Sequence, residues 1–348
     1  METKTTASPT LLSDASGRRI RYLRMSVTDR CDMRCAYCMP EEGVHFSARD
    51  DLLSYEEIER LVTVLTRLGV DSVRISGGEP LLRKDVVRLV ERVAAVPGVE
   101  DVAMTTNARL LHRHSEALKR AGLSRLNISL DSLEPAVFAA MARGWYLPEV
   151  LRGIEAARSA GFSPLKLNCV VAREINQDDP PRLIEFCRER DITPRFIELM
   201  PMGGLEWFGE HRVVSSAEVR EGLRAAGYRL ELLEPGEATE AGPGPARYWR
   251  IRPGGDLAAS WSTVGFISPL SEGFCDSCNR MRISCTGRVR ACLGWDDGVS
   301  LRDLMRAGCS DEALEAAIRG SLAAKRAGHE FTATGEGKTG WTMSSVGG

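Results

Sequence analysis

The sequence lacks a long apolar run and has almost no net charge. The first seventeen residues contain no apolar segment long enough for a secretory signal or a membrane span, and we expect residues 1–17 to be a disordered cytoplasmic lead-in. The 348 residues include 46 basic and 48 acidic side chains, which gives a formal net charge of −2. This balance argues against a protein that binds nucleic acid or an anionic membrane, because both need a positive field. An anionic ligand must therefore be held by cations placed locally around it.

Ten cysteines are present, and in the absence of an export signal we expect reduced thiols, used for metal binding or catalysis, and no disulfides. They form two groups, one with Cys31, Cys35 and Cys38 and the other with Cys275, Cys278, Cys285 and Cys292. The remaining three, Cys169, Cys187 and Cys309, are scattered along the chain and are expected to pack as small hydrophobic residues.

Short β-rich runs alternate with segments of helical spacing in the first part of the chain. The runs are 22–28, 71–77, 101–107, 125–131, 165–171 and 194–200. After the first run, Ser54 and Glu57 have the spacing of a helix-capping box, followed by apolar residues at helical intervals. Because parallel strands need crossover connections, this pattern predicts an α/β fold with an incomplete parallel (β/α)6 barrel.

The pattern changes after residue 201. A capped helix is expected at 215–227, a Pro/Gly-rich loop at 234–246, and strands at 247–251 and 259–268. We therefore predict a barrel over 18–201, a smaller C-terminal α+β appendage over 202–326 that carries the second cysteine group, and a flexible tail over 327–348 that ends in Gly-Gly.

The first cysteine group has the spacing C-x3-C-x2-C. This spacing fits zinc poorly, because structural zinc takes four ligands that commonly come as two close pairs. Iron–sulfur clusters are held by thiolates from short loops, and three thiolates on a four-iron cluster would leave one iron open. An open position is typical of a catalytic metal. A zinc site completed by His45 or by a distant residue remains the alternative.

The second group also offers three thiols, Cys275, Cys278 and Cys292, unless Cys285 completes a four-thiolate site. Four arginines lie among them at 280, 282, 288 and 290, and guanidinium groups suit phosphate oxygens. A solvated strand face is the simpler interpretation for Arg288 and Arg290. Arg280 and Arg282 would point to the same side of an extended segment.

The first group, with Tyr37 before its last cysteine, resembles the signature of the radical S-adenosylmethionine superfamily. The run SGGEP at 76–80 resembles the second mark of that superfamily, in which Gly77 and Gly78 allow close approach to the methionine amino group because neither has a Cβ. The resemblance implies that Cys31, Cys35 and Cys38 hold a [4Fe-4S] cluster whose open iron binds S-adenosyl-L-methionine.

Within that superfamily, the chain resembles the GTP 3′,8-cyclase family from about residue 18 to the end, through both cysteine spacings, the run NRMR and the terminal Gly347-Gly348. The resemblance implies a second [4Fe-4S] cluster at Cys275, Cys278 and Cys292 whose open iron binds the guanine of GTP. It implies a lyase that takes hydrogen from ribose C3′ with a 5′-deoxyadenosyl radical and joins C3′ to guanine C8. The implied product is (8S)-3′,8-cyclo-7,8-dihydroguanosine 5′-triphosphate, in the first step of molybdenum cofactor biosynthesis.

The same resemblance assigns contacts and partners, with no catalytic residue beyond the cluster and cofactor ligands. Contacts to S-adenosylmethionine are implied for Tyr37, Gly78, Ser129 and Met200, and contacts to GTP for Arg24, Arg74, Thr105, Lys166, Arg195, Arg280, Met281 and Arg282. The strand cations among them would have to point into the barrel lumen. The implied partners are a low-potential electron donor of the flavodoxin or ferredoxin type, a downstream cyclic pyranopterin monophosphate synthase, and a second copy of the chain in a homodimer.

Two positions depart from the family pattern: Cys285 replaces a small hydroxyl or aliphatic residue, and Leu293-Gly294 follows Cys292 where an aromatic residue is common. Three other functions fit the sequence less well. A two-cluster electron carrier uses four cysteines per cluster and is much shorter. A peptide-modifying radical enzyme has more C-terminal cysteines, and a zinc-containing nucleic-acid module conflicts with the balanced charge.

Overall fold

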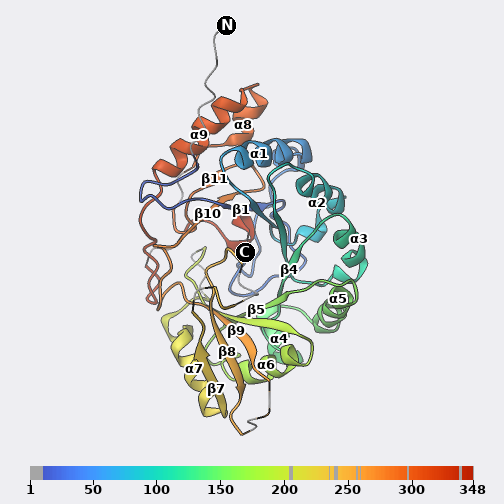
Figure 1. Ribbon diagram of the computed structural model, residues 1–348, viewed down its shortest axis with the longest axis vertical. Coiled ribbons are helices and arrows are strands. Elements are labelled where there is room, and N and C mark those ends of the chain that lie inside the picture. The colour runs from blue at the N-terminus through green and yellow to red at the C-terminus, as the bar shows by residue number, and fades with distance from the viewer. Residues whose placement is uncertain are drawn as a thin grey trace.

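The computed structural model describes residues 11–203, 207–234, 236–238, 242–255, 258, 260–295, 298–336 and 339–347. Within these residues one sheet of eleven strands has the order β11-β10-β1-β2-β3-β4-β5-β6-β9-β8-β7 (Figure 1). The strands are β1 Tyr22–Ser26, β2 Ser72–Ser76, β3 Asp101–Thr106, β4 Arg125–Ser129, β5 Leu165–Val171, β6 Ile192–Glu198, β7 Tyr228–Leu232, β8 Arg247–Pro253, β9 Ser262–Ile267, β10 Arg280–Ile283 and β11 Val289–Arg290.

Strands β1 to β6 are paired in parallel, each with the next along the chain. The predicted incomplete (β/α)6 barrel is therefore confirmed. The α-helices are α1 Tyr55–Arg67, α2 Val86–Ala94, α3 Ser115–Arg120, α4 Pro135–Ala142, α5 Leu147–Ser159, α6 Pro180–Arg188, α7 Ser216–Ala225, α8 Leu301–Arg306, α9 Asp311–Ala323 and α10 Met343–Val346. Single 3₁₀ turns lie at η1 Arg49–Asp51, η2 Pro80–Leu82, η3 Leu111–Arg113 and η4 Glu210–Arg212. Figure 1 shows α1 to α6 around the outside of the barrel strands.

The predicted helix caps are present. Ser54 accepts a hydrogen bond from Glu57 N (3.1 Å) and the Glu57 carboxylate accepts one from Ser54 N (2.7 Å), so the capping box fixes the start of α1. Ser215 and Glu218 form the same box at the start of α7. No helix in the described ranges has the length and apolarity required to cross a membrane.

The C-terminal residues extend the barrel sheet on both sides. Strand β9 pairs in parallel with β6 and is followed outward by antiparallel β8 and β7. At the other edge β10 pairs in parallel with β1, and antiparallel β11 follows. The second cysteine group therefore lies beside the strand that leads into the first group.

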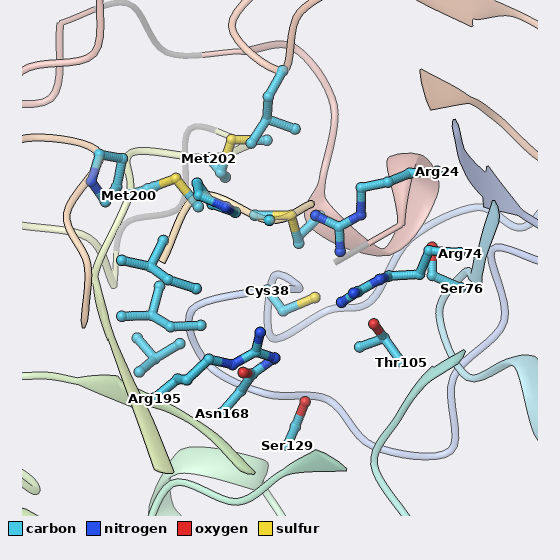
Figure 2. Close-up of a pocket in the computed structure, with 18 of the residues that line it drawn as sticks. Arg24, Cys38, Arg74, Ser76, Thr105, Ser129, Asn168, Arg195, Met200 and Met202 are labelled. Atoms are coloured by element: carbon cyan, nitrogen blue, oxygen red, sulfur yellow. The ribbon is translucent and has the colours of Figure 1, made fainter. Parts of the chain in front are cut away.

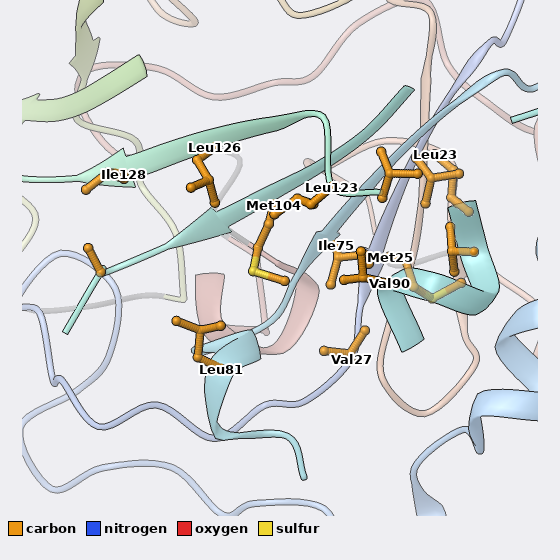
Figure 3. Packing of buried hydrophobic residues seen from close by; sticks show 14 of the residues in the cluster. Leu23, Met25, Val27, Ile75, Leu81, Val90, Met104, Leu123, Leu126 and Ile128 are labelled. Carbon is orange, nitrogen blue, oxygen red and sulfur yellow. The ribbon is translucent and has the colours of Figure 1, made fainter. Parts of the chain in front are cut away.

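Alternation along the strands separates the core from the barrel interior. Leu23 and Met25 of β1 and Ile75 of β2 pack with Val90 of α2 in one continuous hydrophobic core (Figure 3). The alternate residues of these strands, among them Arg24 and Arg74, face the other way and line an internal cavity.

The described residues at both chain ends differ from the predicted flexibility. In the lead-in, Leu12 is fully buried and its N–H donates to Leu68 O (2.9 Å). In the tail, Trp341 and Val346 are buried and form a second hydrophobic cluster with Met202 and Phe331. Small polar residues predict flexibility, but these apolar side chains are buried in the described parts of both segments, 11–17, 327–336 and 339–347. Residues 1–10, 337–338 and 348 lie outside the described residues.

Candidate active site

One cavity inside the barrel brings the predicted site residues together. It encloses about 280 Å³. Its wall includes Arg24, Cys31, Cys35, Tyr37, Cys38, Arg74, Gly78, Thr105, Ser129, Lys166, Arg195, Met200, Cys275, Cys278, Arg280, Arg282 and Cys292. Met281 differs from its neighbours, because its side chain points into the hydrophobic core behind β10. A contact between its side chain and a ligand in this cavity is therefore excluded by strand alternation.

The first cysteine loop is held against the SGGEP run by backbone hydrogen bonds. Gly78 N donates to Thr28 O (2.7 Å) and Glu79 N donates to Arg30 O (2.8 Å). A Cβ on Gly78 would lie 2.3 Å from Arg30 O, and one on Gly77 would lie 2.4 Å from Thr28 O. The glycines are thus required for the contact between the two motifs, and their role in a ligand's approach stays a prediction.

Glu79, in the SGGEP run, joins this run to the end of strand β3 through hydrogen bonds. Its buried carboxylate accepts hydrogen bonds from Leu81 N (3.0 Å), Thr106 Oγ1 (2.8 Å) and Asn107 N (2.7 Å). Burial raises the pKa of Glu79 to about 7, although these donors act in the opposite direction. The carboxylate therefore joins η2 to the end of β3 at the edge of the cavity.

The three thiols of the first group lie in a buried environment. Burial raises the pKa of Cys31 and of Cys38 to about 12, and it raises the pKa of Cys35 well above its ordinary value. Thiolates would form here only if a metal replaced the protons. A cationic iron cluster suits this donor set, because it would replace three protons at once.

The second group has a different electrostatic environment. Burial alone would raise the pKa of Cys278, but the charges of Arg280 and Lys325 outweigh it and lower this pKa to about 7. Lys325 Nζ lies 3.5 Å from the Cys278 sulfur, and an Arg280 nitrogen lies 4.0 Å from it. Burial raises the pKa of Cys292. The donor set therefore includes a thiol that readily becomes a thiolate ligand.

Cys285 lies away from the other three cysteines of its group. It is 3 % exposed, and it is absent from the cavity wall formed by the described residues. Burial raises its pKa to about 12, while a hydrogen bond with the Ser26 side chain acts in the opposite direction. His45 is exposed and is also absent from this wall. Within the described ranges no three His, Cys, Asp or Glu side chains are grouped to hold a single metal ion, and this applies to both cysteine groups alike.

Three arginines lie side by side across neighbouring strands. The register places Arg24 of β1 opposite Arg74 of β2 on one side and opposite Arg282 of β10 on the other. Burial, and next the charge of Arg282, lower the pKa of Arg24. Like charges directly opposite each other destabilise a sheet. Such a row, facing a cavity, is typical of a site that takes an anion.

Further cations come from the opposite wall. Lys166 and Arg195 are 2 % and 4 % exposed, and Figure 2 shows Arg24, Arg74 and Arg195 reaching into the same space. Burial lowers the pKa of Arg195 and of Arg282 to about 10. Several buried polar atoms of the wall have no hydrogen-bond partner: Arg74 Nε, Arg195 Nε, Thr105 Oγ1 and Asn168 Oδ1. Buried polar groups normally have partners, so this wall fits a polar, anionic ligand.

The region between the first cysteines and β4 contains a further carboxylate. The Tyr37 hydroxyl donates to Asp131 Oδ2 (2.9 Å), and Val170 N donates to Asp131 Oδ1 (2.9 Å). Burial raises the pKa of Asp131 to about 6. Ser129, the last residue of β4, and Met200, just after β6, also line the cavity.

Sequence reasoning missed several residues of this site. Glu79 and Asp131 were present in recognised motifs, and their position after a strand was the available signal. Lys325 had no local signal, because its contact with Cys278 joins residues far apart in the chain. Arg290 was expected on a solvated face, but it is buried and its guanidinium lies 4.0 Å from the Trp341 ring centroid.

Comparisons with known proteins agree with this geometry. Residues 25–187 match the Radical SAM superfamily and residues 192–331 match Molybdenum Cofactor Synthesis C. A GTP 3′,8-cyclase of Pseudomonas putida (strain W619) is 44% identical over 93% of this chain and 94% of its own length. One of Marinobacter nauticus is 43% identical over 97% of this chain and 99% of its own. The chain belongs to the GTP 3′,8-cyclase family.

Solved structures agree at the level of the fold. Streptococcus suis SuiB bound to precursor peptide SuiA has a TM-score of 0.57 at 16% identity, over 89% of this chain and 69% of that one. SuiB bound to S-adenosylmethionine has a TM-score of 0.56 at 16% identity, over 85% of this chain and 67% of that one. Members of the GTP 3′,8-cyclase family thus share a radical SAM fold, which implies S-adenosylmethionine and one [4Fe-4S] cluster.

Proposed function

We propose that this chain converts GTP to (8S)-3′,8-cyclo-7,8-dihydroguanosine 5′-triphosphate, the first step of molybdenum cofactor biosynthesis. The observation that carries the proposal is a single cavity in which two sets of three thiols border a wall of buried cations. The first cluster and S-adenosylmethionine would supply the 5′-deoxyadenosyl radical that takes hydrogen from C3′ before C3′ joins C8. The side chains of this chain bind, orient and enclose the reactants.

Cys31, Cys35 and Cys38 are the proposed ligands of the first cluster. We assign contacts with S-adenosylmethionine to Tyr37, Gly78, Ser129 and Met200. The hydrogen bond from Tyr37 to Asp131 fixes the aromatic ring, so Tyr37 can act as part of a rigid wall. Gly78 would contact the cosubstrate through its backbone, because the space where a side chain would start is filled by the cysteine loop at Arg30 O.

Cys275, Cys278 and Cys292 are the proposed ligands of a second [4Fe-4S] cluster. The lowered pKa of Cys278 supports a thiolate at this position. The remaining open iron would bind guanine. Burial of Cys285 outside the cavity supports a three-cysteine set over a four-cysteine set.

Contacts with GTP are proposed for Arg24, Arg74, Thr105, Lys166, Arg195, Arg280 and Arg282. GTP brings about four negative charges, and a chain of net charge −2 has no general field to attract them. The attraction would therefore come from the arginine and lysine side chains among these residues. For Met281 the proposal is limited to its backbone, because its side chain lies in the core.

The wider setting is proposed on the family resemblance. The enzyme would act in the cytoplasm, where thiols remain reduced, as a homodimer. It would receive electrons from a low-potential flavodoxin or ferredoxin and pass its product to cyclic pyranopterin monophosphate synthase. We also propose a boundary between 201 and 202 that keeps all six parallel strands, up to Glu198, in the barrel.

Anaerobic reconstitution tests the proposed function. The protein is reduced with dithionite and supplied with S-adenosylmethionine and a panel of nucleoside triphosphates, and the products are read by mass spectrometry. We expect about eight irons per chain and a cyclised product from GTP alone. Cys31→Ala should abolish 5′-deoxyadenosine formation. Cleavage of S-adenosylmethionine by that variant, or a product from another nucleotide but not from GTP, would show that the assignment is wrong.

A further inference from the structure

The side chain of Lys325, between α9 and the C-terminal tail, is buried against the second cysteine group. Its Nζ lies 3.5 Å from the Cys278 sulfur and donates to Arg280 O (2.8 Å). Its side chain is only 1% exposed. A buried ammonium is costly unless it has partners. Here its partners include the Cys278 sulfur and the Arg280 carbonyl oxygen, so the charge is held directly beside the second cysteine group.

The ammonium is fixed on its other side by Asp14 of the N-terminal segment. Asp14 Oδ2 lies 3.7 Å from Lys325 Nζ, and the Asp14 side chain is fully buried. The same carboxylate accepts hydrogen bonds from Arg18 Nε (2.7 Å), Arg18 N and Ser16 N (3.0 Å each). Asp14 therefore has a fixed position, and it restrains Lys325 in turn.

Arg18 connects this network to the backbone of the second cysteine loop. One terminal nitrogen donates to Cys275 O (2.8 Å) and the other donates to Arg326 O (2.8 Å). The segment before β1 thus contacts the second loop at the Cys275 carbonyl, and through Lys325 at the Cys278 sulfur. Arg18 lies 257 positions before Cys275, and Lys325 lies 47 positions after Cys278.

We propose that Lys325, held by Asp14, is a positioning residue that sets the reduction potential of the second cluster through its contact with the Cys278 sulfur. The inference depends on the second cluster of the proposed function. Hydrogen bonds to cluster sulfurs and the net charge around a cluster determine its potential. A positive charge at the sulfur stabilises the reduced form of the cluster. A negative charge behind that ammonium weakens the effect.

The test measures potentials by a redox titration followed with electron paramagnetic resonance on the iron-loaded protein. The signal that responds to S-adenosylmethionine identifies the first cluster. Lys325→Met should lower the potential of the second cluster and leave that of the first unchanged. Lys325→Arg, which keeps a charge and N–H donors, should return it toward the wild-type value. Asp14→Asn, which removes the anion but keeps the ammonium, should raise it.

Arg326→Met is the matched control, because it removes an exposed cation one position away, and it should leave both potentials unchanged. A purely structural role for Lys325 would not produce shifts of opposite sign in Lys325→Met and Asp14→Asn. A second-cluster potential equal to wild type in both would overturn the proposal, as would an arginine variant no closer to wild type than the methionine variant.

Two further outcomes are distinct from these. If Lys325→Met loads only the first cluster, the Asp14→Asn variant tests the proposal. A potential of its second cluster that is unchanged or lower than wild type overturns the inference. If the wild-type protein itself loads only one cluster, the proposed second site is wrong, and Lys325 has no cluster to act on.

Discussion

Replacement of Gly78 by alanine should detach the first cysteine loop from the SGGEP run. The added Cβ would lie 2.3 Å from Arg30 O, whereas ordinary contacts begin at 3.4 Å, so one of the two backbones must move by about 1 Å (3.4 − 2.3). That movement strains the hydrogen bonds of Gly78 N to Thr28 O and of Glu79 N to Arg30 O. Overpacking costs about 1–3 kcal/mol and each hydrogen bond about 0.5–1.5 kcal/mol, together about 2–6 kcal/mol.

This cost is local, so we expect the loop to move while the barrel stays folded. Iron content after anaerobic reconstitution should fall from about eight to about four per chain, with loss of 5′-deoxyadenosine formation. Gly222→Ala is the matched control, because a Cβ there meets no atom within 4 Å. The alanine should stabilise helix α7 by up to about 1 kcal/mol. Full iron content in Gly78→Ala would refute the packing argument. Full iron with loss of S-adenosylmethionine binding would instead support a role of the glycine in ligand approach.

Three other outcomes are expected. Cys285→Ser should leave iron content and turnover nearly intact, since this thiol is outside the cavity; loss of the second cluster would contradict that. Arg280→Ala and Arg282→Ala should each weaken GTP binding roughly 10- to 100-fold by calorimetry with both clusters loaded, and unchanged affinity in both would place the triphosphate elsewhere. Glu79, whose pKa rises from 4.5 to about 7, stabilises the fold fully below pH 4.5, and this contribution is lost as pH rises through about 7. Urea unfolding of the metal-free proteins measures this. Between pH 5 and pH 8 the free energy of unfolding of wild type should fall by up to about 3 kcal/mol relative to that of Glu79→Gln. Parallel pH profiles of the two proteins would contradict the shifted pKa.

The barrel could be predicted from the sequence because its signals are local. Strand and helix periodicities repeat over a few residues, and the capping box of Ser54 and Glu57 marks a helix start within four positions. The strand at β7 and the role of β10 could not be predicted in this way. Strand β10 has four residues, and it is defined by its pairing with β1, more than 250 positions away.

The site was predicted through motifs and missed where contacts join distant segments. Cysteine and glycine spacings gave the loop residues, and the family resemblance gave Lys166 and Arg195. The clash that explains Gly78 requires the position of Arg30, which no spacing provides. The order of the tail likewise depends on Trp341 meeting Arg290, and on Gly347 O accepting from Arg282 (2.7 Å). Local composition favours flexibility in the tail, and tertiary contacts override it.

The cation wall shows how a chain of balanced charge can favour an anion. Arg74 lies 5.4 Å from the Tyr22 ring centroid, and Arg195 donates to Asn127, yet the Nε atoms of both arginines stay without a partner. Burial lowers the pKa of both groups, which means that their charged forms are less stable here than in water. The fold bears that cost, and a bound anion offsets it. A ligand that binds only the folded state stabilises it in proportion to ln(1 + [L]/Kd). An anion that pairs with these desolvated cations would therefore raise the free energy of unfolding, and no net positive charge on the protein is needed.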